Sequence, residues 1–94
     1  MKAMKTIPTK FAIYHARQLY RHLDDPGGEY LNNFIQILSV YGQHSRIDYI
    51  DLAFFQRTLQ TAVTVSGYEE DNIIWVNFID SNEILQALND WNSI

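Results

Sequence analysis

In the first quarter of the chain, apolar and polar residues alternate with the period of a helix. Apolar residues recur every three or four positions over 9–24, at Ala12, Ala16, Leu19 and Leu23. This spacing predicts an amphipathic helix over 9–24, with Thr9 as its N-cap. The run from Asp24 to Gly28, Asp-Asp-Pro-Gly-Gly, is typical of a turn and ends the helix.

The opposite side of this predicted helix carries basic side chains. At about 100° per residue, four residues share a stripe roughly opposite the apolar one: Lys10, Tyr14, Arg17 and Arg21. We call this stripe the basic ridge. Such a stripe could contact three or four phosphates, dock on an acidic protein surface, or be an ordinary solvated helix face.

Two further segments show helical periodicity. Over 29–41 the apolar positions are Leu31, Phe34, Ile35 and Leu38, and Gly42 follows where a C-terminal cap is expected. Over 46–61 apolar residues cover more than half of the circumference, which predicts a helix at the centre of the core. Asp48 and Asp51 would then lie near its positive N-terminal end.

The period changes to that of strands after residue 61. Residues 62–66 alternate, 67–72 are turn-forming, and 73–79 are β-branched and aromatic, a pattern that predicts a β-hairpin. On its second strand Ile73, Trp75 and Ile79 share one face, which would be either core or an apolar interface. An apolar run as short as 71–79 does not by its period distinguish a strand from a buried helix.

A fourth helix is expected over 81–91. Asp80 followed three residues later by Glu83 resembles a capping box, and one apolar stripe follows it: Ile84, Leu85, Leu88 and Trp91. The fold class predicted is α+β, with three N-terminal helices, a β-hairpin and a C-terminal helix. Residues 1–94 form a single domain, and 1–8 are expected to be a flexible or extended N-terminal segment.

Composition is that of a folded globular protein. The chain has 94 residues, of which 47% are hydrophobic and 19% charged. Because it has no cysteine, disulfides and thiolate chemistry are excluded. The N-terminus has no apolar run of signal-peptide length, and no stretch approaches about 20 apolar residues, the length of a membrane span. We expect a cytoplasmic protein of a bacterium, its virus or another reducing cell.

No pattern typical of an active site or a metal site is found. His15 and His22 would lie two helical turns apart, about 10 Å along the axis, which is too far to share one ion, so both are expected to be solvated surface histidines. The serines lack a G-x-S-x-G elbow, and no glycine-rich phosphate loop occurs. The prediction is a protein that is not an enzyme, with no catalytic residue, metal or cofactor.

Charge is divided between the two halves of the chain. Residues 1–46 hold six basic side chains against three acids, a net charge of +3, and residues 47–94 hold one against eight, a net charge of −7. The predicted partner-binding acids are Asp48, Asp51, Glu69, Glu70 and Asp71. Carboxylates on a rigid frame attract the Lys and Arg groups of a basic protein surface. Alternatively, these charges serve only solubility.

This charge pattern favours a small non-enzymatic protein that binds a basic partner through its acidic C-terminal half. Inhibitors, immunity proteins, antitoxins and phage-encoded blockers of host defence have such sizes and charges. Self-association is a further alternative, either through the apolar face of Ile73, Trp75 and Ile79, or by docking of the basic ridge on the acidic half of a second copy.

The main alternative is DNA binding. Three helices followed by a hairpin and a helix is also the order of winged-helix transcriptional regulators, an analogy at the level of the fold alone. Phosphates would then be held by Lys10, Arg17, Arg21 and Arg46. The predicted recognition helix begins with acids, and the predicted wing tip is Glu-Glu-Asp. In a complex with DNA both acidic segments would face phosphates and be repelled by them. The charges therefore favour a protein partner.

Overall fold

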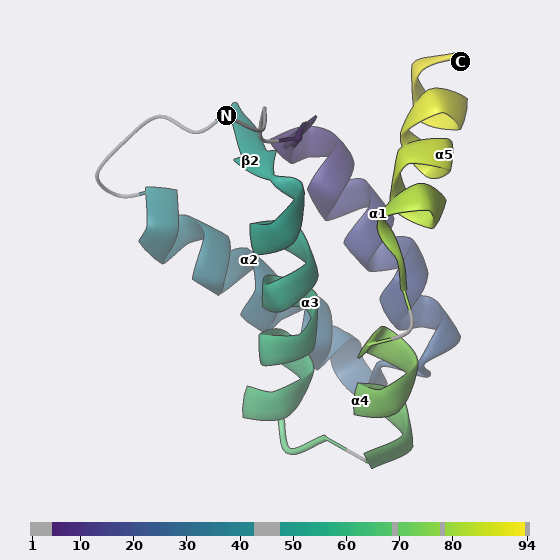
Figure 1. The fold of residues 1–94 in the computed structure, drawn as a ribbon. Coiled ribbons are helices and arrows are strands. Elements are labelled where there is room, and N and C mark those ends of the chain that lie inside the picture. Colours follow the sequence, from purple (N-terminus) through teal and green to yellow (C-terminus); the bar gives the residue numbers. More distant parts are fainter. Residues whose placement is uncertain (1–4, 43–47, 69, 78, 94) are drawn as a thin grey trace.

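Helices form most of the structure. We describe the chain from a computed structural model, which covers residues 5–42, 48–68, 70–77 and 79–93. In these ranges five α-helices accompany a small two-stranded antiparallel sheet (Figure 1), so the α+β class is confirmed at that level. The elements are β1 (Thr6–Pro8), α1 (Thr9–His22), a 3₁₀ turn (Pro26–Gly28), α2 (Glu29–Gly42), β2 (Tyr49–Asp51), α3 (Leu52–Val65), α4 (Glu70–Asn77) and α5 (Ser81–Asn92).

Helix α1 confirms the first predicted helix but not its cap. Its capping position is held by Pro8, and Thr9 is already helical. The Thr9 amide donates to the Asp48 carbonyl at 2.9 Å, so a backbone group of the residue before β2 satisfies one of the free N–H groups at this helix end. A proline before the helix lacks a side-chain acceptor, and the neighbouring segment supplies the acceptor instead.

The two short strands place the N-terminal segment beside the start of α3. Thr6–Pro8 pairs with Tyr49–Asp51 in antiparallel register, with Ile7 opposite Ile50, and both of these isoleucines are buried. The Leu52 amide also donates to the Lys5 carbonyl at 3.0 Å. Residues 1–4 lie outside the described residues.

The third helix begins later than the sequence predicted. Helical structure starts at Leu52 rather than at residue 46, and residues 46 and 47 lie outside the described residues. Residues 49–51 are extended because β1 supplies their hydrogen-bond partners and the pairing buries Ile50. The assignment of Asp48 to the first turn of the helix is therefore wrong. Asp51 occupies the capping position, but its side chain makes no capping hydrogen bond.

The Asp-Asp-Pro-Gly-Gly turn ends α1 and also caps α2. One oxygen of the Asp25 carboxylate accepts from the Tyr30 amide at 2.8 Å, and the other accepts from the Leu31 amide at 3.2 Å. Asp24, with φ of 56°, and Gly27, with φ of 67°, adopt the left-handed conformation that the reversal needs. The predicted second helix is confirmed from Glu29 to Gly42.

The predicted β-hairpin over 62–79 is wrong. Residues 62–65 continue α3, and Glu70–Asn77 forms the separate helix α4. Ala62 and Val63 lie on the same buried helix face as Leu59, and burial of this continuous stripe outweighs the β-branched character of the segment. The wing expected for a winged-helix domain is therefore not formed by these residues, and Arg46 lies outside the described residues.

Helix α5 confirms the prediction over 81–91. Asp80 is its N-cap, and the Asp80 carboxylate accepts from the Glu83 amide at 2.9 Å. Ile84 is fully buried, and the rest of the predicted stripe packs against the core: Leu85, Leu88 and Trp91. The ring centroids of Trp91 and Phe11 are 5.7 Å apart, so α5 packs beside α1 (Figure 1).

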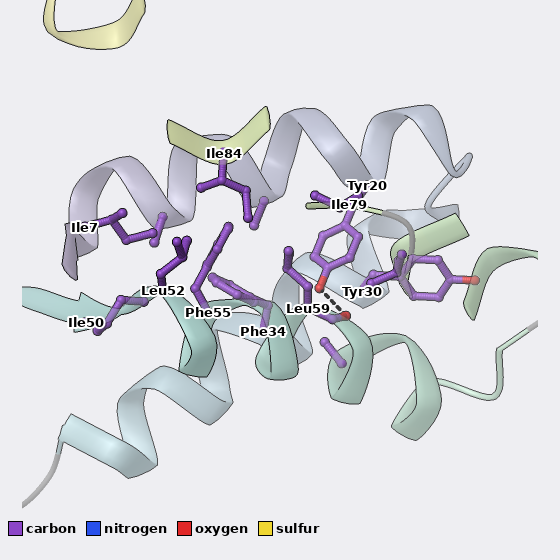
Figure 2. Close-up of a cluster of buried hydrophobic side chains, with 14 of the residues drawn as sticks. Ile7, Tyr20, Tyr30, Phe34, Ile50, Leu52, Phe55, Leu59, Ile79 and Ile84 are labelled. Atoms are coloured by element: carbon purple, nitrogen blue, oxygen red, sulfur yellow. Dashed lines mark hydrogen bonds between the residues drawn. The ribbon is translucent and has the colours of Figure 1, made fainter. Parts of the chain in front are cut away.

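Helices α1, α2 and α3 meet around a cluster of aromatic rings. Phe34 of α2 and Phe55 of α3 pack edge to face with centroids 5.8 Å apart, and Tyr20 of α1 packs against Phe34 at 6.3 Å. The Tyr20 hydroxyl donates to the Leu59 carbonyl at 2.8 Å (Figure 2). Burial, with a smaller effect of the nearby Asp25 carboxylate, raises the pKa of the Tyr20 phenol far above its ordinary value, so the hydroxyl remains a donor.

Replacing Tyr20 with phenylalanine removes the hydroxyl and leaves the ring. We expect the Tyr20→Phe variant to lose about 1 kcal/mol of unfolding free energy, because one buried hydrogen bond between α1 and α3 is lost. Urea denaturation measures this change. The control is Tyr14→Phe, which changes an exposed tyrosine of the same helix and should alter stability by less than about 0.5 kcal/mol. Equal effects of the two variants would contradict the structural role given to Tyr20.

Candidate functional site

The basic ridge lies on the outer face of α1, as the helical period predicted. Its four residues, Lys10, Tyr14, Arg17 and Arg21, are all exposed. From Lys10 to Arg21 the ridge extends about 16 Å along the axis. Within the described ranges, no basic side chain of the ridge forms an ion pair with an acid of the same molecule. These charges are therefore open to another molecule.

The predicted acidic residues do not form one patch. Asp48 and Asp51 lie at the start of α3, beside the sheet, whereas Glu70 and Asp71 begin α4, beyond the far end of α3 (Figure 1). Helix α3 has 14 residues and is about 21 Å long, which is the scale of their separation. Glu69 lies outside the described residues. The prediction thus grouped residues from two ends of the molecule.

A second set of acids, which shares Glu70 and Asp71 with the predicted one, lies on α4, on α5 and at the residue before α5. This set, which we call the α4–α5 acidic layer, consists of Glu70, Asp71, Asp80, Glu83 and Asp90, and all five are exposed. No basic residue follows Arg57 in the sequence, so neither α4 nor α5 carries a cation of its own. Asp80 caps α5, and Asp90 accepts a 3.4 Å hydrogen bond from Gln86.

The predicted apolar interface is not a single exposed face. Ile79 is 7% exposed and belongs to the core, and Ile73 is partly buried against it. Trp75 is 38% exposed, and its ring lies 6.5 Å from that of His22 on α1. Ile73, Trp75 and Ile79 were predicted to share a face because alternate side chains of a strand point to the same side. In the helix that forms here, Ile73 and Trp75 are about 200° apart.

His15 and His22 have different environments. His22 is exposed, as expected, but the prediction of a solvated side chain is wrong for His15. The His15 ring stacks on Phe11 with centroids 5.3 Å apart and lies 6.1 Å from Phe55, and its Nε2 is buried without a hydrogen-bond partner. Burial lowers the pKa of the His15 imidazole. In the part of the chain that the structure describes, no group of three or more His, Cys, Asp or Glu side chains could hold a metal ion.

An apolar groove between α2 and α3 was not predicted from the sequence. Its volume is about 460 Å³, and we call it the α2–α3 groove. It is lined by Asn33, Gln36, Ile37 and Val40 of α2 and by Phe54, Thr61 and Val65 of α3. A sequence signal does exist: no residue from 30 to 42 is charged, and Arg57 is the one charged residue from 52 to 68. It was missed because the sequence does not show which faces of these two helices lie side by side.

A second hollow lies where α1 meets the turn before α2. Its volume is about 390 Å³, and its charged lining is mixed: Arg17, Arg21, Asp24 and Asp25. The Asp25 carboxylate is already hydrogen-bonded to the first amides of α2. The role of Asp25 here is to cap α2. Because the lining carries charges of both signs, the hollow does not indicate what kind of ligand it would bind.

Comparison of the chain with protein-family models, with curated proteins and with solved structures finds no match. Among the described helices, none is both long enough and apolar enough to cross a membrane.

The burial of His15 predicts a pH dependence of stability. Because its pKa is lower in the folded state than the ordinary 6.5, the unfolded chain binds the proton more readily. The contribution of His15 is unchanged well above pH 6.5, and stability falls as the pH drops from 6.5 toward the folded-state pKa. The free energy of unfolding of the wild type should therefore decrease over this window relative to that of a His15→Phe variant.

Urea denaturation at pH 7.5, 6.5 and 5.5 measures this difference. A His22→Gln variant, altered at the exposed histidine, is the control and should follow the wild type. If His15→Phe and the wild type lose stability in parallel as the pH falls, the buried imidazole is not the source of the dependence.

Proposed function

We propose that this protein is a non-enzymatic protein-binding module that contacts a basic partner through its α4–α5 acidic layer. The observation that carries the proposal is a set of five exposed acids on α4, on α5 and before α5, a part of the chain in which no basic residue occurs. Opposite potentials accelerate association and exclude partners of the wrong charge. The role is that of a cytoplasmic inhibitor, immunity protein, antitoxin or phage blocker of host defence.

The arrangement of the layer supports this role. Glu70 and Asp71 lie in the first turn of α4, and Glu83 lies in the first turn of α5. Each of these helices is attached to the core by a buried residue, Val76 in α4 and Ile84 in α5. The carboxylates are therefore held on two packed helices, an arrangement that suits recognition of spaced Lys and Arg groups.

Asp48 and Asp51 are left out of the proposed contact. They lie at the other end of α3, next to the sheet. This separation makes the proposal testable, because acids inside and outside the layer can be neutralised in equal number. Effects of net charge alone would then be the same for both sets.

The test is fluorescence anisotropy of a labelled deca-arginine peptide titrated with the protein at low and at moderate salt. The layer variant is Glu70→Gln/Asp71→Asn/Glu83→Gln, and the matched control is Asp24→Asn/Asp48→Asn/Asp51→Asn, which removes the same number of charges. We expect the layer variant to weaken peptide binding about tenfold, since three exposed charge pairs of about 0.5 kcal/mol each are lost. The control should weaken it by no more than about threefold.

Equal weakening by both variants would overturn the proposal, because only net charge would then matter. A labelled random-sequence DNA duplex provides the second arm of the experiment. Salt-sensitive binding of the duplex that is lost in an Arg17→Gln/Arg21→Gln variant, without binding of the peptide, would replace the proposal with nucleic-acid binding by the basic ridge.

A further inference from the structure

The α2–α3 groove lies on a surface that contrasts with the charged surfaces of the molecule. Helix α2 has no charged residue after Glu29, and α3 has only Arg57. Since 19% of the whole chain is charged, a face built from two 14-residue helices with so few charges is unusual. Depletion of charge at the centre of a surface patch is typical of protein interfaces.

Large apolar side chains are exposed along this groove. Val40 on α2 and Val65 on α3 are each 63% exposed, and the half-buried Ile37 and Phe54 lie between the two helices. The Thr61 hydroxyl donates to the Arg57 carbonyl of its own helix at 2.9 Å. Its proton is therefore already used inside α3, and the lining of the groove is dominated by carbon.

The polar groups of the groove are amides rather than charges. Asn33 and Gln36 lie among its lining residues, and the Asn33 amide nitrogen donates to the Ser66 hydroxyl across the two helices. An amide can both donate and accept, so it can pair with the same group of another copy. A charged side chain would instead meet a like charge in a two-fold contact between identical faces.

We propose that a second copy of this chain packs on the α2–α3 groove and forms a two-fold symmetric dimer. The charge pattern supports this occupant, because a nearly uncharged face is complementary to itself. A net charge of −4 makes two copies repel each other on average, and a nearly uncharged face adds no like-charge contact to that repulsion.

The size of the face suits a weak dimer that forms only at high protein concentration. Helix α2 crosses obliquely behind α3 (Figure 1), and each helix is about 21 Å long with a diameter of about 10 Å. Their joint projection is about 400 Å², and side-chain relief makes the accessible area larger. Stable interfaces begin at about 600 Å² per partner.

Sedimentation equilibrium over a protein concentration range of about 1–500 μM tests the proposal. The wild type should reach twice the monomer mass of 11.0 kDa. Val40→Glu and Val65→Glu should each weaken dimerisation at least tenfold, because a charge is placed on the uncharged face. Ile74→Glu, at a 43% exposed isoleucine of α4, is the matched control and should remain dimeric. Circular dichroism confirms that each variant is folded.

A second measurement does not depend on variants that carry a new charge. The chain has no cysteine, so Val65→Cys or Ile74→Cys introduces a single thiol. A short bis-maleimide should cross-link Val65→Cys molecules and not Ile74→Cys molecules. A monomeric wild type at 500 μM overturns the proposal, as does a dimer that survives both glutamate variants. A wild type that stays monomeric while the groove binds an apolar small-molecule probe would assign the groove to a different ligand.

Discussion

The packing of α2 against α3 is the most extensive helix contact among the described residues, and the hydrogen bond from the Tyr20 hydroxyl to the Leu59 carbonyl attaches α1 to α3 (Figure 2). Tyr20 also packs edge to face on Tyr30 and Phe34 of α2, so this one residue contacts both helices. A buried phenol needs an acceptor, and the Leu59 carbonyl lies within reach only when α1 is docked on α3 in this arrangement. Once the three helices are joined, α4 and α5 complete the core through Val76 and Ile84.

This core directs three chemically different surfaces outward. The basic ridge of α1 and the α4–α5 acidic layer belong to different helices, and within the described residues their charges do not pair with each other. The α2–α3 groove is nearly uncharged and apolar. In our proposals the groove serves self-association and the acidic layer serves the partner. The two proposals rest on separate residues, so each can fail without the other.

Helices were predictable where local signals were sufficient, as for the period of α1 and the Asp80 cap of α5. The extended segment of Tyr49–Asp51 was not predictable, because its partner strand lies about forty residues away in the sequence. The segment 62–79 was misread because Val63, Val65 and Ile73 are β-branched, whereas the buried stripe of α3 continues through Ala62 and Val63 and keeps residues 62–65 helical. Each acidic residue is visible in the sequence. That α3 separates Asp48 and Asp51 from Glu70 and Asp71 could be seen only in the structure. The groove could not be predicted because the sequence does not show which faces of α2 and α3 lie side by side.

The central claim is that the uncharged face pairs with itself and leaves the charged surfaces free for other contacts. The most direct measurement is an isotope-filtered NOE experiment on an equal mixture of labelled and unlabelled wild-type protein. The account predicts intermolecular contacts at the methyl groups of Val40 and Val65 and none at those of Ile74. Intermolecular contacts at Ile74 and Trp75 with none in the groove would contradict it, and so would the absence of any such contact at millimolar concentration.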